Sequence, residues 1–130
     1  MPNPNERVAG RLNGKQEACV YVAFANGKMV EFAVDTAFDG ALAVPRSLAG
    51  QFGWETRSKT SMKTFGRKRA RDFEVVYERI FWFGQEELVE IIISEDDDDQ
   101  LLGIHLLANK ILRINYETGT VTITAAKKKH

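Results

Sequence analysis

The sequence predicts an all-β domain, and its residue pattern and composition carry this prediction. β-Branched and aromatic residues are concentrated in short runs, and glycine or asparagine interrupts these runs repeatedly. The chain has 130 residues, which is the length of one domain that can bury a sizeable core. Its apolar content of 44% and charged content of 28% are ordinary for a globular protein. We therefore expect a single β-rich domain.

The first half of the chain contains a strong hairpin signal and a short helix signal. Asn26-Gly27 lies between two apolar runs and predicts a type I′ turn. Pro45 before a short segment and Gly53 after it predict a helix between them. The elements expected here are a strand at Ala18–Phe24, its partner at Met29–Val34, a short strand at Ala41–Val44, a helix at Arg46–Phe52 and an extended polar segment at Thr56–Phe65.

The second half predicts five more strands, separated by charged loops and one short helix. Gly84 divides two long apolar runs and indicates a turn between them. The expected elements are a basic turn at Gly66–Arg71, long strands at Phe73–Phe83 and Glu87–Ser94, an acidic loop at Glu95–Asp99, a short strand at Leu101–Gly103, a helix at about Ile104–Asn109, and final strands at Ile111–Tyr116 and Thr120–Thr124.

Domain boundaries follow from the polar ends of the chain. We expect a flexible N-terminal segment at residues 1–14, one domain at residues 15–126 and a basic tail at residues 127–130. Residues 1–10 are polar and lack the apolar centre of a signal peptide, and no apolar run approaches the roughly 20 residues that span a bilayer. The formal net charge of zero argues against nucleic acid or an anionic membrane as a partner. A cytoplasmic location is the expectation.

Cys19 is the only cysteine, so no disulfide can form within the chain. Its neighbours Ala18, Val20 and Val22 are apolar. This setting favours a buried, unreactive thiol over a nucleophile.

The segment from Val34 to Gly40 carries the clearest functional signal. Asp35 follows directly on an apolar strand, although acidic side chains are rarely buried unless they are paired or take part in chemistry. Ala37 and Gly40 are small, so a ligand or another segment of backbone can come close. We therefore expect the carboxylate of Asp35 at the floor of a cleft.

Three features in a fixed order give the chain a family resemblance. Asp35-Thr36-Ala37 follows an apolar strand, a central hairpin has Gly66 at its tip, and Leu101-Leu102-Gly103 leads into the predicted short helix and the two final strands. In these features the chain resembles the retropepsin-like (clan AA) aspartic proteases, in particular their small prokaryotic members, over roughly residues 15 to 125.

The resemblance implies a closed β-barrel with one short C-terminal helix that forms a two-fold homodimer. The family uses one catalytic aspartate from each half of its site, and this chain has one Asp-Thr-Ala motif, so each chain would supply one Asp35. Two carboxylates held close together cannot both ionise and share one proton. One activates a water molecule as general base while the other polarises the scissile carbonyl. The implied protein is an aspartic endopeptidase that acts on a peptide or protein substrate without a cofactor.

The resemblance also assigns roles to individual residues. Thr36 would brace the two catalytic loops, Ala37 would offer backbone groups to an extended peptide, and the hairpin around Gly66 would be a flap that excludes water. The candidate residues are Asp35 as the catalytic group, Thr36 and Ala37 as support of the catalytic loop, Asp39, Gly40, Phe65, Gly66 and Arg67 for substrate binding, Leu101, Leu102 and Gly103 as structural support, and none for a metal.

Some residues depart from the family pattern and leave alternatives open. Ala37 stands where glycine is usual, His105 stands where Asp or Asn is usual, and Asp39 is also compatible with a simple turn before Gly40. A catalytically weak or inactive protease-like module that binds peptides is therefore the first alternative. The second is a small β-barrel that binds nucleic acid through Arg67–Arg71, although aromatic residues for base stacking are sparse there.

Two charged runs suggest a contact between subunits. Gly66–Arg71 is strongly basic and Glu95–Asp99 is strongly acidic. The simplest interpretation is that both are solvated loops. The resemblance brings the acidic loop of one chain towards the flap of its partner, which leads to the hypothesis of an electrostatic latch between Arg67–Arg71 and the partner's Glu95–Asp99. Salt would screen such a latch.

Overall fold

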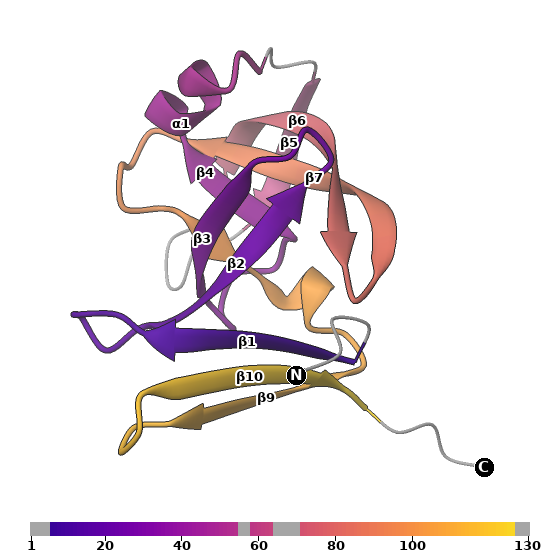
Figure 1. The fold of residues 1–130 in the computed structure, drawn as a ribbon. Helices are drawn as coiled ribbons and strands as arrows, with labels where there is room; N and C mark the ends of the chain where they lie inside the picture. The colour runs from indigo at the N-terminus through magenta and orange to yellow at the C-terminus, as the bar shows by residue number, and fades with distance from the viewer. Residues whose placement is uncertain (1–5, 55–57, 64–70, 127–130) are drawn as a thin grey trace.

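The structure is a computed structural model that describes residues 6–54, 58–63 and 71–126. These residues form a mainly β fold with one α-helix and one 3₁₀ turn (Figure 1). The elements are β1 (Arg7–Leu12), β2 (Ala18–Phe24), β3 (Met29–Val34), β4 (Leu42–Pro45), α1 (Arg46–Gln51), β5 (Ser58–Lys63), β6 (Arg71–Trp82), β7 (Gln85–Ser94), β8 (Leu101–Leu102), η1 (Ile104–Leu106), β9 (Lys110–Asn115) and β10 (Thr120–Ala125).

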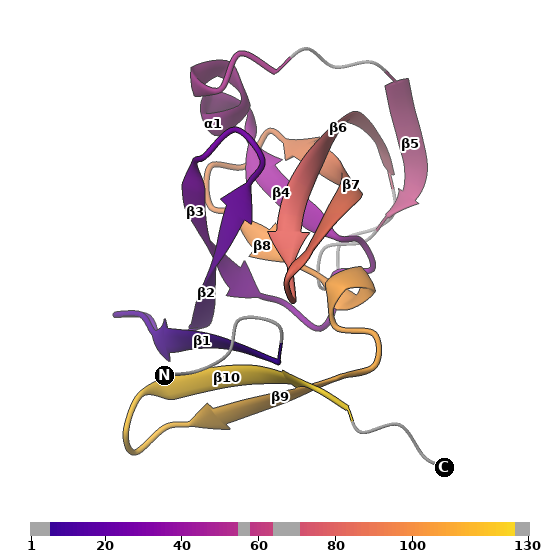
Figure 2. The ribbon, with the colours of Figure 1, turned by 45° about the vertical axis from the view of Figure 1, so that its right-hand side comes forward.

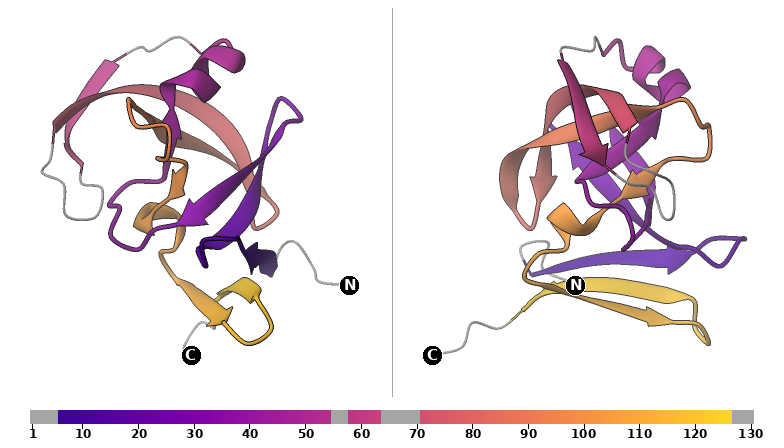
Figure 3. Two further views of the ribbon diagram at one scale, coloured as in Figure 1. Left: turned by 90° about the vertical axis from the view of Figure 1, so that its left-hand side faces the viewer. Right: turned by 180° about the vertical axis from the view of Figure 1, so that it is seen from behind.

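The strands form one hydrogen-bonded sheet that folds back on itself. Its strand order is β5-β6-β7-β4-β8-β3-β2-β1-β10-β9, and β6 also pairs with β2. Figures 1 and 3 show β1, β10 and β9 as a separate layer at one end of the molecule, with α1 at the other end. The long β6–β7 hairpin curves around the middle of the molecule (Figure 2).

The hairpin between β2 and β3 lies where the sequence predicts it, but its turn is not of type I′. A type I′ turn needs positive φ at both central residues, and of Asn26 and Gly27 only Gly27 has it, at 89°. The Gly27 N–H donates to the Phe24 carbonyl at 2.9 Å, and the Lys28 N–H donates to Oδ1 of Asn26 at 3.0 Å. The side chain of Asn26 therefore completes a longer loop instead of forming the predicted two-residue turn.

The N-terminal region differs from the expected flexible segment, because Arg7–Leu12 form β1. This strand pairs with β10 on one side and with β2 on the other. Gly10 permits the second pairing, because a Cβ atom at this position would overlap the carbonyl oxygen of Cys19. Val8 and Leu12 pack against the main core from the same strand. The pairing thus joins the two ends of the chain within one molecule.

The helix expected at about Ile104–Asn109 is only the three-residue 3₁₀ turn η1. The Leu107 N–H donates to the Ile104 carbonyl, and Asn109 has a positive φ of 60°, which stops helical continuation. The N–H groups of Ile104 and His105 donate outside the turn, to the carbonyls of Phe38 and Gly40. The only α-helix in the described ranges is α1, as Pro45 and Gly53 indicate.

The apolar core has a large and a small cluster. The large cluster joins the inner faces of most strands and includes the fully buried Phe32, Leu42 and Ile123. The small cluster contains Phe38, Ala43, Val75 and Ile92. No helix in the described part of the chain is long and apolar enough to cross a membrane.

Cys19 is buried, as the sequence predicts, with 3% of its surface exposed. Burial is the main cause that raises the pKa of its thiol, and the negative charge of Glu31 adds to this effect. A raised pKa keeps the thiol protonated near neutral pH, so Cys19 is a poor nucleophile.

Candidate active site

The candidate site is centred on the loop between β3 and β4, which begins with Asp35. The Asp35 side chain is half-buried, and Oδ1 accepts the Ala37 N–H at 2.9 Å. The Asp35 carbonyl accepts the Phe38 N–H at 3.1 Å, which closes a tight turn with Thr36 and Ala37 exposed at its tip. The carboxylate is therefore oriented from within its own loop, while the tip of the loop stays accessible.

Phe38 anchors this loop from below. Its side chain is fully buried and packs with Ala43, Val75 and Ile92 in the small core cluster. Sequence analysis did not single out Phe38. The available signal was a large aromatic residue within a short loop that is otherwise polar and small.

Strand β8 lies between the strand that enters the loop and the strand that leaves it. Leu101 and Leu102 pair parallel to β3 and antiparallel to β4, and Leu102 is fully buried. The Asp35 N–H donates to the Leu102 carbonyl at 2.9 Å, and the Gly103 N–H donates to the Ala41 carbonyl at 2.8 Å. Strand β8 thus fixes both ends of the loop through backbone hydrogen bonds.

Two glycines allow these segments to approach so closely. A Cβ atom at Gly103 would overlap the Gly40 carbonyl oxygen and lie 2.6 Å from the Phe38 carbonyl oxygen. A Cβ atom at Gly40 would lie 2.6 Å from Cζ of Phe38. Their backbones do not have the positive φ that favours glycine, so the requirement is one of space.

The structure brings most of the predicted site residues together. Asp39 is half-buried and Gly40 is buried in the same loop, next to Gly103. Phe65, Gly66 and Arg67 of the predicted flap lie outside the described residues.

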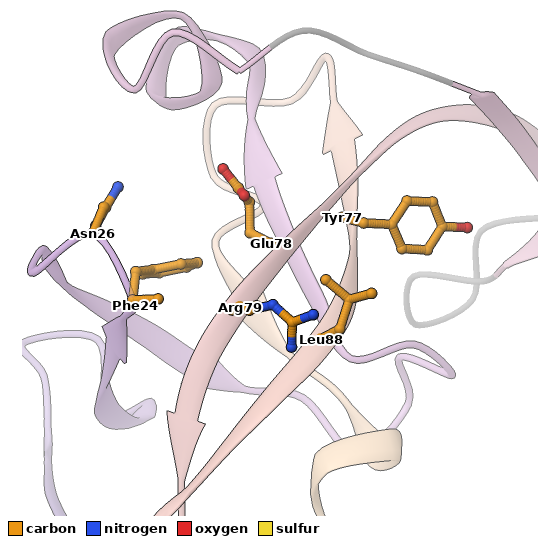
Figure 4. A pocket seen from close by; sticks show the side chains of 7 residues that line it. Phe24, Asn26, Tyr77, Glu78, Arg79 and Leu88 are labelled. Atoms are coloured by element: carbon orange, nitrogen blue, oxygen red, sulfur yellow. The ribbon is translucent and has the colours of Figure 1, made fainter.

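A separate pocket of about 320 Å³ lies away from the Asp35 loop (Figure 4). It is found between the β2–β3 turn and the β6–β7 hairpin. The residues that line it are Phe24, Ala25, Asn26, Tyr77, Glu78, Arg79 and Leu88. No predicted site residue is among them, so this pocket is not the expected cleft above Asp35. Within the described ranges, no group of three or more His, Cys, Asp or Glu residues could hold a metal ion.

Comparison with solved structures identifies the fold. A mostly β chain with one short α-helix and an Asp-Thr-Ala loop seated on a short central strand is typical of the retropepsin-like fold. The chain is similar to the crystal structure of a retropepsin-like aspartic protease from Rickettsia conorii, with 19% sequence identity and a TM-score of 0.64. The alignment covers 89% of this chain and 97% of that chain. No protein-family model and no curated protein matches this sequence. The predicted retropepsin-like fold is confirmed.

Proposed function

We propose that the protein is an aspartic endopeptidase whose active site combines Asp35 from each of two identical chains. The observation that carries this proposal is the Asp35 loop. In a retropepsin-like fold, Asp35 follows β3, its N–H is bonded to Leu102 of β8, and the loop tip is exposed. Such a loop can face a second copy of itself without a change in its own backbone.

The chemistry follows from two such carboxylates facing each other. A shared proton leaves one Asp35 charged, to activate water as general base, and the other protonated, to polarise the peptide carbonyl. Thr36 and Ala37 support the loop, Asp39 and Gly40 contact the substrate backbone, and Phe65, Gly66 and Arg67 cover the peptide.

The dimer contact in this proposal differs from an exchange of terminal strands. Strand β10 is paired with β1 on one edge and with β9 on the other, so an exchange would first break these pairs. Among the described strands, β5 and β9 end the sheet, and β9 belongs to the layer that joins the two termini. The outer edge of β9 is therefore available to a second chain. The β6–β2 pairing supports the closed barrel that the proposal assumes.

Ala37 is compatible with this proposal. Ala37 does not have positive φ, so its Cβ does not strain the backbone, and the residue is exposed. The alternative of an inactive peptide-binding module therefore gains no support from a distorted loop.

The test is peptide cleavage by the parent protein and by Asp35→Asn, measured across pH with a broad peptide library. The proposal expects cleavage by the parent and none by the variant, while the melting temperature and sedimentation coefficient stay unchanged. Peptide binding by the parent without cleavage at any pH would favour the binding module. A parent that cleaves as a strict monomer would exclude the shared dyad.

A further inference from the structure

Arg46 connects three segments of the chain that are far apart in sequence. It is the first residue of α1, and its Nε donates to Oε1 of Glu95 at 2.7 Å. Its Nη2 donates to Oε2 of Glu74 at 2.8 Å. One guanidinium group thus joins the start of α1, strand β6 and the loop that follows β7.

The helix itself does not favour an arginine at this position. The N-terminus of a helix carries a partial positive charge, which disfavours a cation there. The first turn of α1 contains no acidic residue, and its N-cap, Pro45, makes no side-chain capping bond. The placement of Arg46 is instead accounted for by Glu74 and Glu95. Their hydrogen bonds raise the pKa of Arg46, and Arg46 in turn lowers the pKa of Glu95.

Glu95 begins an acidic loop that is held along its length by its own polar groups. Ser94 is buried, donates its hydroxyl to Oδ2 of Asp99 at 2.7 Å, and accepts the Asp96 N–H at 3.1 Å. The Asp98 N–H donates to Oδ1 of Asp96 at 2.9 Å. The loop is therefore an ordered connection and not only a solvated run of charge.

The same loop ends beside the catalytic loop. The Gln100 side-chain amide donates to the Glu31 carbonyl at 2.6 Å, and the Gln100 carbonyl accepts the Ala33 N–H at 2.9 Å. The next two residues form β8, whose Leu102 holds the Asp35 N–H. A continuous set of contacts therefore runs from Arg46 to the backbone of Asp35.

Glu74, the second carboxylate that Arg46 binds, lies at the base of the β5–β6 hairpin. In the sheet, Glu74 lies opposite Lys59 of β5 and opposite Ile93 of β7. A shift of this hairpin relative to the acidic loop must therefore stretch or break the hydrogen bond of Arg46 to Glu74 or the one to Glu95.

We propose that Arg46 is a positioning residue that fixes the base of the β5–β6 hairpin relative to the loop leading into β8, and so determines how tightly an extended peptide is held over Asp35. This inference rests on the proposed function. It also gives Glu95 a contact within its own chain. Most of the basic run of the suggested subunit latch, Arg67–Arg71, lies outside the described residues.

The test compares the steady-state kinetics of the parent, Arg46→Ala and Arg46→Lys. The Arg11→Ala variant is a matched control, because Arg11 forms an ion pair with the half-buried Glu31 at 3.1 Å that does not connect the hairpin to the acidic loop. We expect Arg46→Ala to raise KM by about threefold to tenfold with little change in kcat. Arg46→Lys should show a smaller rise in KM than Arg46→Ala but not the parental KM, since a lysine cannot span both carboxylates as a planar guanidinium does.

Salt and the control variant decide the outcome. In salt of about 1 M, the KM of the parent should rise towards that of Arg46→Ala, because exposed charges are screened. An unchanged KM for Arg46→Ala, or an equal rise for Arg11→Ala, would overturn the inference.

A parent that cleaves no peptide would contradict the proposed function but still leave the role of Arg46 testable. Amide hydrogen exchange then tests whether Arg46 holds the base of the β5–β6 hairpin against the acidic loop. We expect faster exchange at residues 58–63, 71–75 and 95–100 in Arg46→Ala and not in Arg11→Ala. Parental exchange rates in both variants would refute the positioning role.

Discussion

The loop at residues 35–40 and the loop at residues 95–99 both end against β8 but are held in different ways. The first is fixed by backbone hydrogen bonds and by the fully buried Phe38. The second is fixed by side-chain hydrogen bonds and by the ion pair of Glu95 with Arg46. Close packing around Phe38 therefore determines the conformation of the first loop. Polar and charged side chains determine the conformation of the second. Changes of volume should affect the first loop, and changes of salt or pH should affect the second.

The largest effect is expected from Phe38→Ala, which removes the anchor of the first loop. Loss of a fully buried phenylalanine costs about 3–5 kcal/mol of unfolding free energy. Urea denaturation measures this loss, with Phe81→Ala as the control, because Phe81 is 49% exposed. If both variants lost the same free energy, Phe38 would not be the anchor.

A smaller effect is expected from Gly103→Ala, which adds one methyl group between Gly40 and Phe38. Overpacking of this kind costs about 1–3 kcal/mol, and it must also displace the loop that carries Asp35. Thermal denaturation and peptide cleavage should both report a loss. Gly50→Ala is the control, since nothing lies near its Cβ position in α1, and it should gain up to about 1 kcal/mol. Full activity in Gly103→Ala would show that this close packing is dispensable.

Ser94→Ala should have a moderate effect on the second loop. The variant leaves the Asp99 carboxylate and the Asp96 N–H without their hydroxyl partner, which costs about 1–2 kcal/mol. Chemical denaturation checks this value against Ser47→Ala, an exposed serine in α1. Equal stability of the two variants would argue against an ordered acidic loop.

The smallest effect concerns the stability contributed by the Arg46–Glu95 pair as a function of pH. Arg46 lowers the pKa of Glu95, so the contribution is fully present above the ordinary pKa of a glutamate and is lost as pH falls through the lowered value. The difference in melting temperature between the parent and Arg46→Ala should therefore be small near neutral pH and vanish in acid. A melting-temperature difference between the two proteins that grows as the pH falls would contradict a stabilising Arg46–Glu95 pair.

The elements predicted well from sequence are those set by local pattern. Strands β2 and β3 match their predicted bounds, because alternating apolar residues and the Asn26-Gly27 loop act within one hairpin. Asp35 and Leu101-Leu102-Gly103 were recognised through a resemblance and are joined in the structure by backbone hydrogen bonds.

What sequence did not predict depends on partners far away in the chain. Strand β1 has no fully buried residue and depends on pairing with β10 and β2. The turn η1 is tied to the loop at residues 35–40, because the Ile104 and His105 amides donate to the Phe38 and Gly40 carbonyls. The contact of Arg46 with Glu74 and Glu95 joins residues that no local pattern connects.

The central claim is that one active site needs Asp35 from two chains, and mixed dimers test it most directly. Parent and Asp35→Asn chains are unfolded, mixed in equal amounts and refolded together, and cleavage is measured per parent-plus-variant chain. If only dimers with two Asp35 residues are active, random pairing leaves about a quarter of the parental activity. Retention of about half would mean that each chain acts alone and would contradict the shared dyad.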